Sequence, residues 1–415
     1  MKPKALMNAN RFDIAAKTLY GRHYLKNVEG SFGEELYLQH LRVWNNLIEK
    51  EPNKKGCQDF LNSYKTLLDN INKNGFQEEV SKVPIHNSSP LNGAHRIASC
   101  IVLDKEISTY EGELIEGQPV CDYKYLKYKR NFVSSGLDEL FLDEMALEFC
   151  RIKDNVYTIT LFPSHHFPID ALVHMIKEKY GIIYRKRIIL TNTGMFNYIH
   201  NLYYGESWIG SKESNYPGVS AKASLCFSLG NVAEVLLIEE NNVEELFKFK
   251  QELRSHCGVS NHSVHINDTQ EETWRIASSV FNRNSIDYMN KKQFHHTPRF
   301  DSYFDSYRDI LSQYSDKEDF CVDSSAVLSA YGLRDCRDLD FLHLRDVEDL
   351  APMIECHNAE SRHYRLPKND IIFNPRNHFY RHGLKFASLE VVRKMKEYRD
   401  EEKDRRDISL IGEVK

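Results

Sequence analysis

Two aspartates, Asp338 and Asp340, stand one residue apart in the segment CVDSSAVLSAYGLRDCRDLDFLHL, which runs from Cys321 to Leu344. Residues at alternate positions of a β-strand share one face of it, so on a strand these two carboxylates would lie side by side. Paired carboxylate oxygens are ligands that suit Mg²⁺. The pair therefore predicts a metal site for phosphate chemistry, with both aspartates as metal ligands and catalytic residues.

A second segment with the chemistry to bind phosphate is NGAHR, which contains Asn92, Gly93, His95 and Arg96. Its last residues fall in the first turn of an expected helix, where acidic side chains are usually preferred. A cationic first turn favours the binding of an anion. The free backbone amides and the flexible backbone of Gly93 can bind a phosphate group, and Arg96 can add a bidentate contact. The alternative is that Arg96 pairs with a nearby acid and His95 only packs.

The elements that must position the aspartate pair form a strand-helix-strand unit. Residues 320–322 are expected to be a short strand, and apolar spacing predicts a helix over 324–331 that Gly332 closes. The second strand is expected over 338–344, so the carboxylates open it.

The elements around the NGAHR segment are equally regular. Apolar residues recur at helical spacing between 57 and 75, and Gly75 is placed to cap that helix. A short strand is expected at 83–85 and a polar turn at 87–90.

Expected strands and helices alternate in the middle of the chain. Strands are expected at 155–162, 182–190 and 232–238, and helices at 171–180 and 243–254. The loop from Gly205 to Lys222, with glycines, two lysines and Trp208, is either a sugar or phosphate site or an ordinary surface loop.

The segment around the aspartate pair resembles the core signature of the nucleotidyltransferase fold. Ser324 and Ser325 occupy the position of a Gly-Ser pair that faces the nucleotide phosphates, and Asp338 and Asp340 occupy the position of the metal-binding Asp-x-Asp pair. The resemblance implies that Mg²⁺ neutralises the triphosphate and aligns the attacking hydroxyl. Many members add a third carboxylate, for which Asp370 is the candidate here.

The end of the chain resembles the same families. There, Lys403, Asp404, Asp407 and Ile408 form a KD-x-x-DI run on a charged helix. The alternative is a solvated helix with charge pairs at spacings of three and four.

The NGAHR segment resembles the Gly-x-His-Arg box of the ParB and sulfiredoxin-like superfamily, in which the turn binds the phosphates of ATP or CTP. Asn92 stands where Asp is common. The sulfinic acid reductase activity of that superfamily is disfavoured, because Cys100 lies on the helix rather than beside the box. A DNA clamp is disfavoured because no basic helix-turn-helix is found.

Composition limits the partners and the location. The 415 residues carry a formal charge of −5, which argues against non-specific nucleic-acid binding. Nine cysteines without a CxxC pair indicate a reducing compartment. With no signal peptide and no long apolar window, a cytoplasmic protein without a membrane span is expected.

Length and pattern together predict a mixed α/β protein with three domains. These are a ParB/sulfiredoxin-like domain over 1–125, a mixed α/β domain over 126–300 and a nucleotidyltransferase-like domain over 301–415. The expected function is Mg²⁺-dependent nucleotidyl or phosphoryl transfer from ATP or CTP to a small phosphorylated sugar or polyol. Similar domain pairings point to surface-polysaccharide biosynthesis and a glycosyltransferase partner.

Two alternatives remain open. One is a nucleotide-sensing regulatory or assembly protein without catalysis. The other is a small-molecule kinase that uses the N-terminal domain alone.

Overall fold

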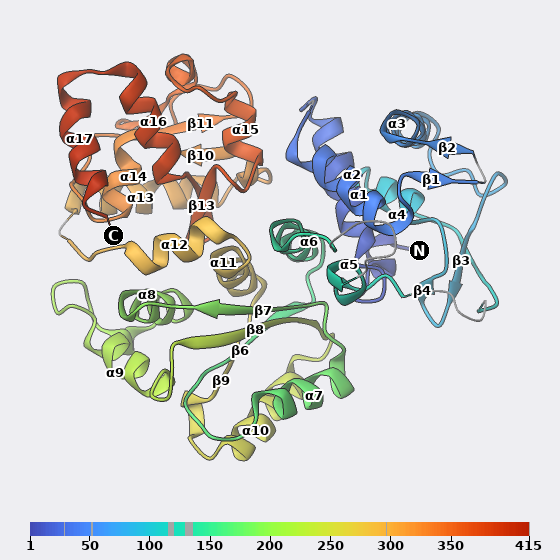
Figure 1. Ribbon diagram of the computed structural model, residues 1–415, viewed down its shortest axis with the longest axis horizontal. Helices are drawn as coiled ribbons and strands as arrows, with labels where there is room; N and C mark the ends of the chain where they lie inside the picture. Colours follow the sequence, from blue (N-terminus) through green and yellow to red (C-terminus); the bar gives the residue numbers. More distant parts are fainter. Residues whose placement is uncertain (29, 51–52, 115–119, 129–135, 296, 415) are drawn as a thin grey trace. The chain divides into compact units, whose positions relative to one another are not determined.

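A computed structural model describes residues 1–28, 30–50, 53–114, 120–128, 136–295 and 297–414 of the chain (Figure 1). Helices and strands mix along the whole length, which confirms the predicted mixed α/β class. None of the helices described is both long and apolar enough to cross a membrane.

The chain divides into two compact units, and neither is continuous in sequence. The first contains Met1–Thr158, Ile169–Arg185 and Leu236–Leu246. The second contains Ile159–Pro168, Lys186–Val235 and Phe247–Lys415. The three-domain division expected from the sequence stays a prediction.

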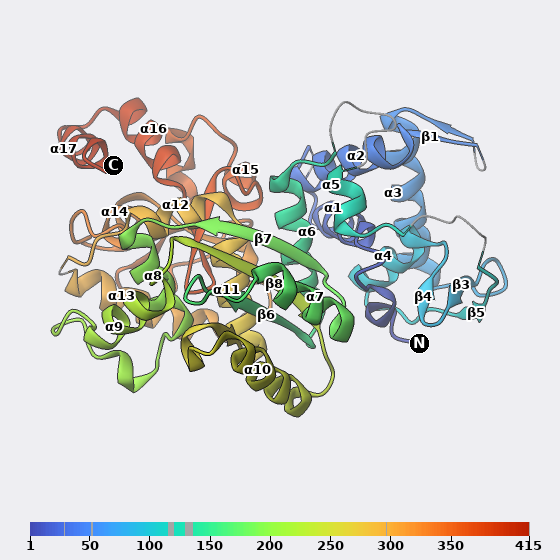
Figure 2. The same ribbon diagram turned by 60° about the horizontal axis from the view of Figure 1, so that its bottom comes forward.

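The first unit is built around one central helix, α1 (Asp13–Leu25), which contacts four other helices. Figure 2 shows α1 among them. They are α2 (Phe32–Asn45), α3 (Cys57–Asn74), α4 (Ala94–Val102) and α6 (Glu139–Ile152). The rest of the unit includes η1 (Pro3–Leu6), α5 (Tyr123–Tyr128) and α7 (Ile169–Tyr180).

The predicted amphipathic helix after residue 57 is confirmed as α3. Its buried side chains are Phe60, Leu61, Tyr64, Leu68 and Ile71. The helix ends at Gly75, whose φ of +73° is a left-handed conformation that glycine adopts without steric cost.

Short strands flank the helices of the first unit. β3 (Val83–His86) pairs antiparallel with β4 (Ser89–Pro90) and parallel with β5 (Thr109–Glu111). A separate pair joins β1 (Ile48–Glu49) and β2 (Lys54–Lys55). The NGAHR segment follows β4 and leads into α4.

The three predicted strands of the middle region are confirmed, and with a fourth, β9, they form one sheet in the order β7-β8-β6-β9. Its strands are β6 (Val156–Leu161), β7 (Tyr184–Ile189), β8 (Val232–Glu239) and β9 (Val264–Ile266). Every residue of β6 is buried, so this strand lies inside the protein rather than at a surface. The predicted helix after β8 is α10 (Val243–Cys257).

The second unit holds the remaining helices before its C-terminal sheet. They are α8 (Asn192–Leu202), η2 (Ser207–Ile209), α9 (Pro217–Cys226), η3 (Ser260–His262), α11 (Gln270–Val280), α12 (Arg283–Lys291) and α13 (Pro298–Leu311). α12 contacts α8 and α11, and α13 contacts the C-terminal sheet through β11.

A five-stranded sheet in the order β12-β11-β10-β14-β13 forms the C-terminal part. Its strands are β10 (Phe320–Val322), β11 (Leu339–His343), β12 (Ile354–Cys356), β13 (His378–Arg381) and β14 (Leu384–Ala387). β10 pairs antiparallel with β11 and parallel with β14, and β11 pairs parallel with β12. α14 (Ser324–Ala330) connects β10 to β11, which confirms the predicted strand-helix-strand unit.

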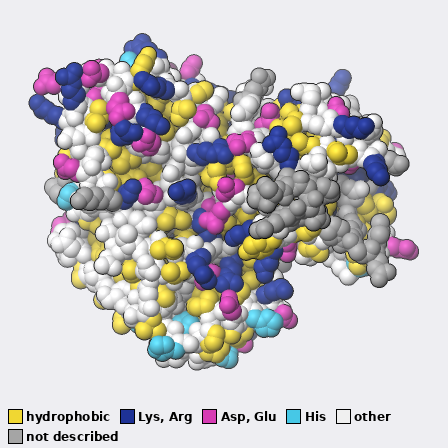
Figure 3. Space-filling view, in the orientation of Figure 1, with side chains coloured by type: hydrophobic (Ala, Val, Ile, Leu, Met, Phe, Trp, Pro, Cys, Tyr) yellow, Lys and Arg dark blue, Asp and Glu magenta, His cyan; other side chains and the backbone are white. Residues whose placement is uncertain are grey.

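The remaining elements surround this sheet. They are η4 (Lys317–Asp319), η5 (Asn358–His363), α15 (Lys368–Phe373), α16 (Leu389–Arg399) and α17 (Glu402–Gly412). Over α16 and α17, at the upper left of Figure 3, Lys and Arg side chains alternate with Asp and Glu side chains. Arg393, for example, pairs with Glu390 at 2.7 Å and with Glu397 one turn on.

Candidate functional site

The predicted aspartate pair lies where β11 begins. Asp338 directly precedes this strand and Asp340 is its second residue. Because β11 and β12 run parallel, Asp340 pairs in register with Glu355. One carboxylate oxygen from each of Asp338, Asp340 and Glu355 lies within 4.8 Å of the other two. Two neighbouring strands thus bring three acids to one place.

A second group of side chains shares Asp340 with the first. Asp323 follows β10 directly, and its backbone N–H donates to the carbonyl of Asp340 at 2.9 Å. Nδ1 of His357 lies 3.5 Å from Oδ1 of Asp323 and 4.0 Å from Oδ2 of Asp340. Tyr364 donates from its hydroxyl to Oδ2 of Asp323 at 2.7 Å.

Two atoms of this second group are buried without a hydrogen bond to any described residue. They are Oδ1 of Asp323 and Nδ1 of His357. The Asp323 carboxylate is fully enclosed, with none of its surface exposed. These two atoms lie 3.5 Å from each other, so protonated His357 offsets part of the cost of burying the Asp323 carboxylate.

The electrostatics of the site follow from burial and crowded charge. Burial raises the pKa of Asp340, and the Asp323 carboxylate raises it further, to about 7, although His357 opposes the shift. Burial alone would lower the pKa of His357, but Asp323 and then Asp340 outweigh it and raise that pKa to about 9. An imidazolium therefore neutralises part of the acidic cluster at neutral pH.

The two ligand sets suit different metals. Asp338, Asp340 and Glu355 offer only carboxylate oxygens, which are the ligands that Mg²⁺ prefers. The set of Asp323, Asp340 and His357 includes an imidazole nitrogen, which suits transition metals better. A metal bound there would first have to displace the proton of His357. The residues present therefore fit Mg²⁺ at the first set.

The two serines of the expected Gly-Ser position begin α14. Ser324 is buried and has a φ of +54°, a left-handed conformation that is uncommon for residues with a side chain. Glycine would adopt this conformation without strain. The backbone at this position therefore has the conformation that favours glycine, although the residue is serine. Its hydroxyl is also hydrogen-bonded to Asp340, which lowers the pKa of that acid. Ser325 is only partly exposed, and its carbonyl accepts from Ser329 at 3.3 Å.

Four residues of the site were not predicted from the sequence. Asp323 lies within the quoted motif, between β10 and α14, but the sequence assigns it no role. Glu355, on β12, and His357 and Tyr364 lie after β11, in a stretch without helical spacing. Only the parallel pairing of β12 with β11 brings Glu355 beside Asp340. A short apolar stretch around residue 354 is the one local signal for that strand.

Asp370, the candidate third carboxylate, lies on α15 and has other partners. Its carboxylate accepts from Asn374 at 3.0 Å and from Asn377 at 2.8 Å. It belongs to neither acidic group, and Glu355 is the third carboxylate that the structure places beside the pair.

The two aspartates of the KD-x-x-DI run, Asp404 and Asp407, belong to a buried ion network, whereas Lys403 is exposed and pairs with Glu401 at 2.9 Å. Lys396 contacts Asp404 at 3.3 Å and Asp407 at 2.8 Å. Arg399 contacts Asp404 at 2.7 Å, and Arg334 contacts Asp407 at 2.6 Å. The run therefore fixes α17 against α16 and the loop after α14.

In the first unit, Gly93 is the N-cap of α4 and has a φ of +83°. Oδ1 of the exposed Asn92 accepts from the Gly93 N–H at 2.6 Å. The guanidinium of Arg96 donates to the carbonyls of Ser81 at 3.3 Å and Lys82 at 3.0 Å. Arg96 thus contacts backbone oxygens, not the acid that the alternative interpretation expected.

His95 packs against aromatic rings, as that alternative interpretation expected. Its Nε2 lies 3.0 Å from the hydroxyl of Tyr37, and its ring meets that of Tyr64 edge to face. Burial lowers the pKa of His95 well below its usual value, and the nearby Lys17 lowers it further. A neutral His95 therefore faces a cavity of about 660 Å³, lined by Asn92 and Gly93 among others.

No protein-family model matches the chain, and neither a curated protein nor a solved structure matches it. The resemblances to the nucleotidyltransferase fold and to the ParB and sulfiredoxin-like superfamily therefore stay predictions that rest on the motifs.

Proposed function

We propose that this chain catalyses Mg²⁺-dependent nucleotidyl or phosphoryl transfer to a small phosphorylated sugar or polyol. The observation that carries the proposal is the meeting of Asp338, Asp340 and Glu355, whose ligand oxygens lie within 4.8 Å of one another on two adjacent strands. A third acid beside the predicted pair completes the ligand set that the nucleotidyltransferase resemblance implies.

In this proposal the three carboxylates hold Mg²⁺, which when bound would neutralise the nucleotide phosphates and align the attacking hydroxyl. Ser324 or Ser325 would contact the phosphates. Tyr364 fixes the carboxylate of Asp323 at the base of the site. The reaction class needs mainly positioning and charge, which residues held on strands supply.

The NGAHR turn would bind a second phosphate-bearing ligand, ATP or CTP. Arg96 is held by backbone carbonyls, so the backbone amides at the start of α4 are the groups left to contact a phosphate. The cavity of about 660 Å³ beside Asn92 and Gly93 is large enough for a ligand of nucleotide size.

The cellular setting is proposed from the resemblance alone. It points to surface-polysaccharide biosynthesis, a cytoplasmic location and a glycosyltransferase partner.

The test is to incubate the full chain with Mg²⁺ and each of the four nucleoside triphosphates in turn. Pyrophosphate as product means nucleotidyl transfer, and a nucleoside diphosphate means phosphoryl transfer. Asp340→Asn should abolish the turnover, whereas Glu348→Gln, a change at an exposed acid outside both ligand groups, should leave it unchanged. Turnover that survives Asp340→Asn would remove the acidic group from the mechanism.

A second candidate function is nucleotide sensing without catalysis. It is favoured by the position of His357, whose imidazolium lies against Asp323 and Asp340 and supplies positive charge where a metal would otherwise lie. Binding of nucleotide without any product would support this candidate over the enzyme.

A third candidate is a small-molecule kinase in the first unit. A chain cut near residue 125 would lose part of that unit, since α6 and two later segments belong to it. The full chain with Gly93→Ala is the better test, because an added Cβ would lie 2.9 Å from Nη2 of Arg96 and disturb the turn. If this variant keeps all ATP turnover, the NGAHR turn is not the catalytic site.

A further inference from the structure

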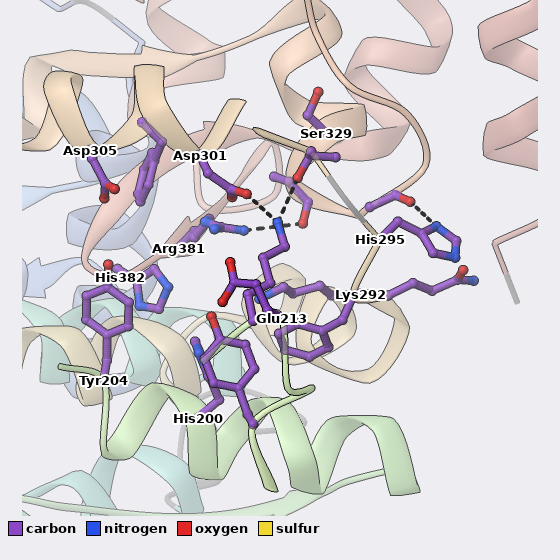
Figure 4. Close-up of a pocket in the computed structure, with 18 residues that line it drawn as sticks. His200, Tyr204, Glu213, Lys292, His295, Asp301, Asp305, Ser329, Arg381 and His382 are labelled. Carbon is purple, nitrogen blue, oxygen red and sulfur yellow. Dashed lines mark hydrogen bonds and ion pairs between the residues drawn. The ribbon is translucent and has the colours of Figure 1, made fainter. Parts of the chain in front are cut away.

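A second cavity, of about 250 Å³, lies in the second unit at the C-terminal end of α14. Its walls come from α8, the loop before α9, the residues after α12, α13 and the turn between β13 and β14. Figure 4 shows His200, Tyr204 and His382 on one side of it and His295 on the other. The acidic group of the candidate site begins at the opposite end of α14, and none of its residues lines this cavity.

Two cationic side chains of this cavity have no carboxylate partner. The amine of Lys292, a residue that is 8% exposed, forms no ion pair or hydrogen bond with the part of the chain that the structure describes. Its one specific contact is the ring of Phe294, whose centroid lies 4.3 Å away. Arg381 donates to the hydroxyl of Tyr288 at 3.1 Å and to the carbonyl of Ala330 at 3.5 Å, and it lies over the rings of Phe300 and Phe304.

Three acids line the cavity, and two of them pair with cations other than Lys292 and Arg381. Asp301 pairs closely with Lys212, which lines the same cavity, and Asp305 pairs with Arg308 at 3.2 Å. The third acid of the lining is Glu213.

Among the described residues, neither Lys292 nor Arg381 forms an ion pair with any of these carboxylates. Burial lowers the pKa of the Lys292 amine well below its usual value, and Arg381 lowers it further. A buried amine without a carboxylate partner holds a proton poorly, and an anion bound beside it would stabilise the charged form.

The histidines of the cavity respond to this unmatched charge. Burial lowers the pKa of His200 and of His382 well below the usual value, and Lys292 and Arg381 lower both further. Nδ1 of His382 and Nε of Arg381 are buried and have no hydrogen-bond partner among the described residues. These two nitrogen atoms therefore remain able to hydrogen-bond to a ligand in the cavity.

We propose that this cavity is a binding site for a small molecule that carries a phosphate group, with Lys292 and Arg381 as its ligands. The two side chains come from different elements, one after α12 and one from β13, and both line the cavity, so an anion with several oxygens can contact both. The volume is below that of usual drug-sized sites, so the ligand is smaller than a nucleotide. The aromatic rings of Tyr204, Tyr216 and Phe294 would line its apolar part.

The test is calorimetric titration of the full chain with inorganic phosphate at low ionic strength, with sodium acetate as comparator. Lys292→Met replaces the buried amine by an apolar chain of similar length. We expect it to weaken phosphate binding at least about tenfold, the usual loss when a charged hydrogen bond is removed. Lys291→Met is the matched control, because Lys291 is the preceding residue and pairs with Asp287 at 3.1 Å.

A folding defect is distinguished by thermal melting. A lysine held for a ligand is unfavourable in its absence, so Lys292→Met should melt at the same temperature as the wild type or higher. Weakened binding by such a variant supports the site, since the protein is still folded.

Three results would overturn the proposal. The first is unchanged phosphate affinity in Lys292→Met, and the second is acetate binding as tight as phosphate binding. The third is loss of phosphate binding in Asp340→Asn, which would place the phosphate at the acidic site instead. Asp340→Asn changes only the acidic site. Phosphate binding at Lys292 can therefore be tested even if the proposed enzyme activity is not found.

Discussion

At the residue scale, Ser324 shows how a single backbone angle connects the sequence to the site. The motif resemblance expects glycine there, and the structure gives Ser324 a φ of +54°, which glycine tolerates best. A residue with a Cβ in this conformation is strained, and such strain is often kept at functional sites. The sequence showed that serine stands where the motif has glycine, but it did not predict the positive φ.

This conformation makes a prediction for stability. Ser324→Val should destabilise the protein by about 2 kcal/mol or more, because a β-branched side chain fits the left-handed region poorly. Ser324→Gly should stay within about 1 kcal/mol of the wild type, since relief of strain offsets the greater freedom of the unfolded chain. Urea unfolding measures both.

Ser325→Val is the matched control, because Ser325 has no positive φ and lies on the same helix. Serine and valine have similar helix propensities, so this change should cost under about 0.5 kcal/mol. Equal losses from the two valine substitutions would contradict the role of the backbone angle.

His357 and Asp340 make a prediction for pH dependence in metal-free protein. Both groups hold a proton more tightly in the folded state, so stability should fall as pH rises. Asp340, with a pKa of about 7, contributes stability that is complete below about pH 4 and lost as the pH rises through 7. His357, with a pKa of about 9, contributes stability that is complete below about pH 6.5 and lost as the pH rises through 9.

The His357 contribution is on the order of 3 kcal/mol. Denaturant midpoints measured in the presence of a chelator should therefore fall between pH 6.5 and 9, and His357→Gln should flatten that part of the curve. A variant curve parallel to that of the wild type would show that His357 does not carry the proton.

At the element scale, the sequence predicted the regular elements well and their pairing poorly. The strand-helix-strand unit lies within a residue or two of its expected bounds, because apolar spacing and Gly332 are local signals. β12 has three residues, and its parallel partner β11 ends eleven positions earlier in the chain. No local pattern encodes such a pairing, so Glu355 could not be placed beside Asp340 from the sequence.

The α16 and α17 pair makes a prediction at the same scale. Asp404→Ala should destabilise the protein by about 3–5 kcal/mol, because it leaves the buried Lys396 and its neighbour Arg399 with one carboxylate fewer. Arg405→Ala, a change on α17 that breaks only an exposed contact with Asp400, should leave the unfolding midpoint unchanged. Similar midpoints for the two variants would mean that the buried network does not hold α17.

At the scale of the whole molecule, the alternation of helices and strands was enough to predict the mixed α/β class. It was not enough to predict the two units, because each unit collects segments that are distant in the sequence. The strands β6, β7 and β8 each contribute residues to both units, so composition and linker signals could not mark a boundary inside them.

The candidate phosphate sites each lie within a single unit. The NGAHR turn and its cavity belong to the first, whereas the acidic group and the cavity at Lys292 belong to the second. Each site can therefore be removed by substitution within its own unit and measured in the full chain.

The most direct test of the proposed metal centre is the binding of Mn²⁺, a paramagnetic stand-in for Mg²⁺, followed by electron paramagnetic resonance. Because Glu355 joins Asp338 and Asp340 only through the fold, it is the residue to change. We predict that the wild type and Glu348→Gln bind the ion equally and that Glu355→Gln binds it at least about tenfold more weakly. Equal binding by wild type and Glu355→Gln would contradict the three-carboxylate site.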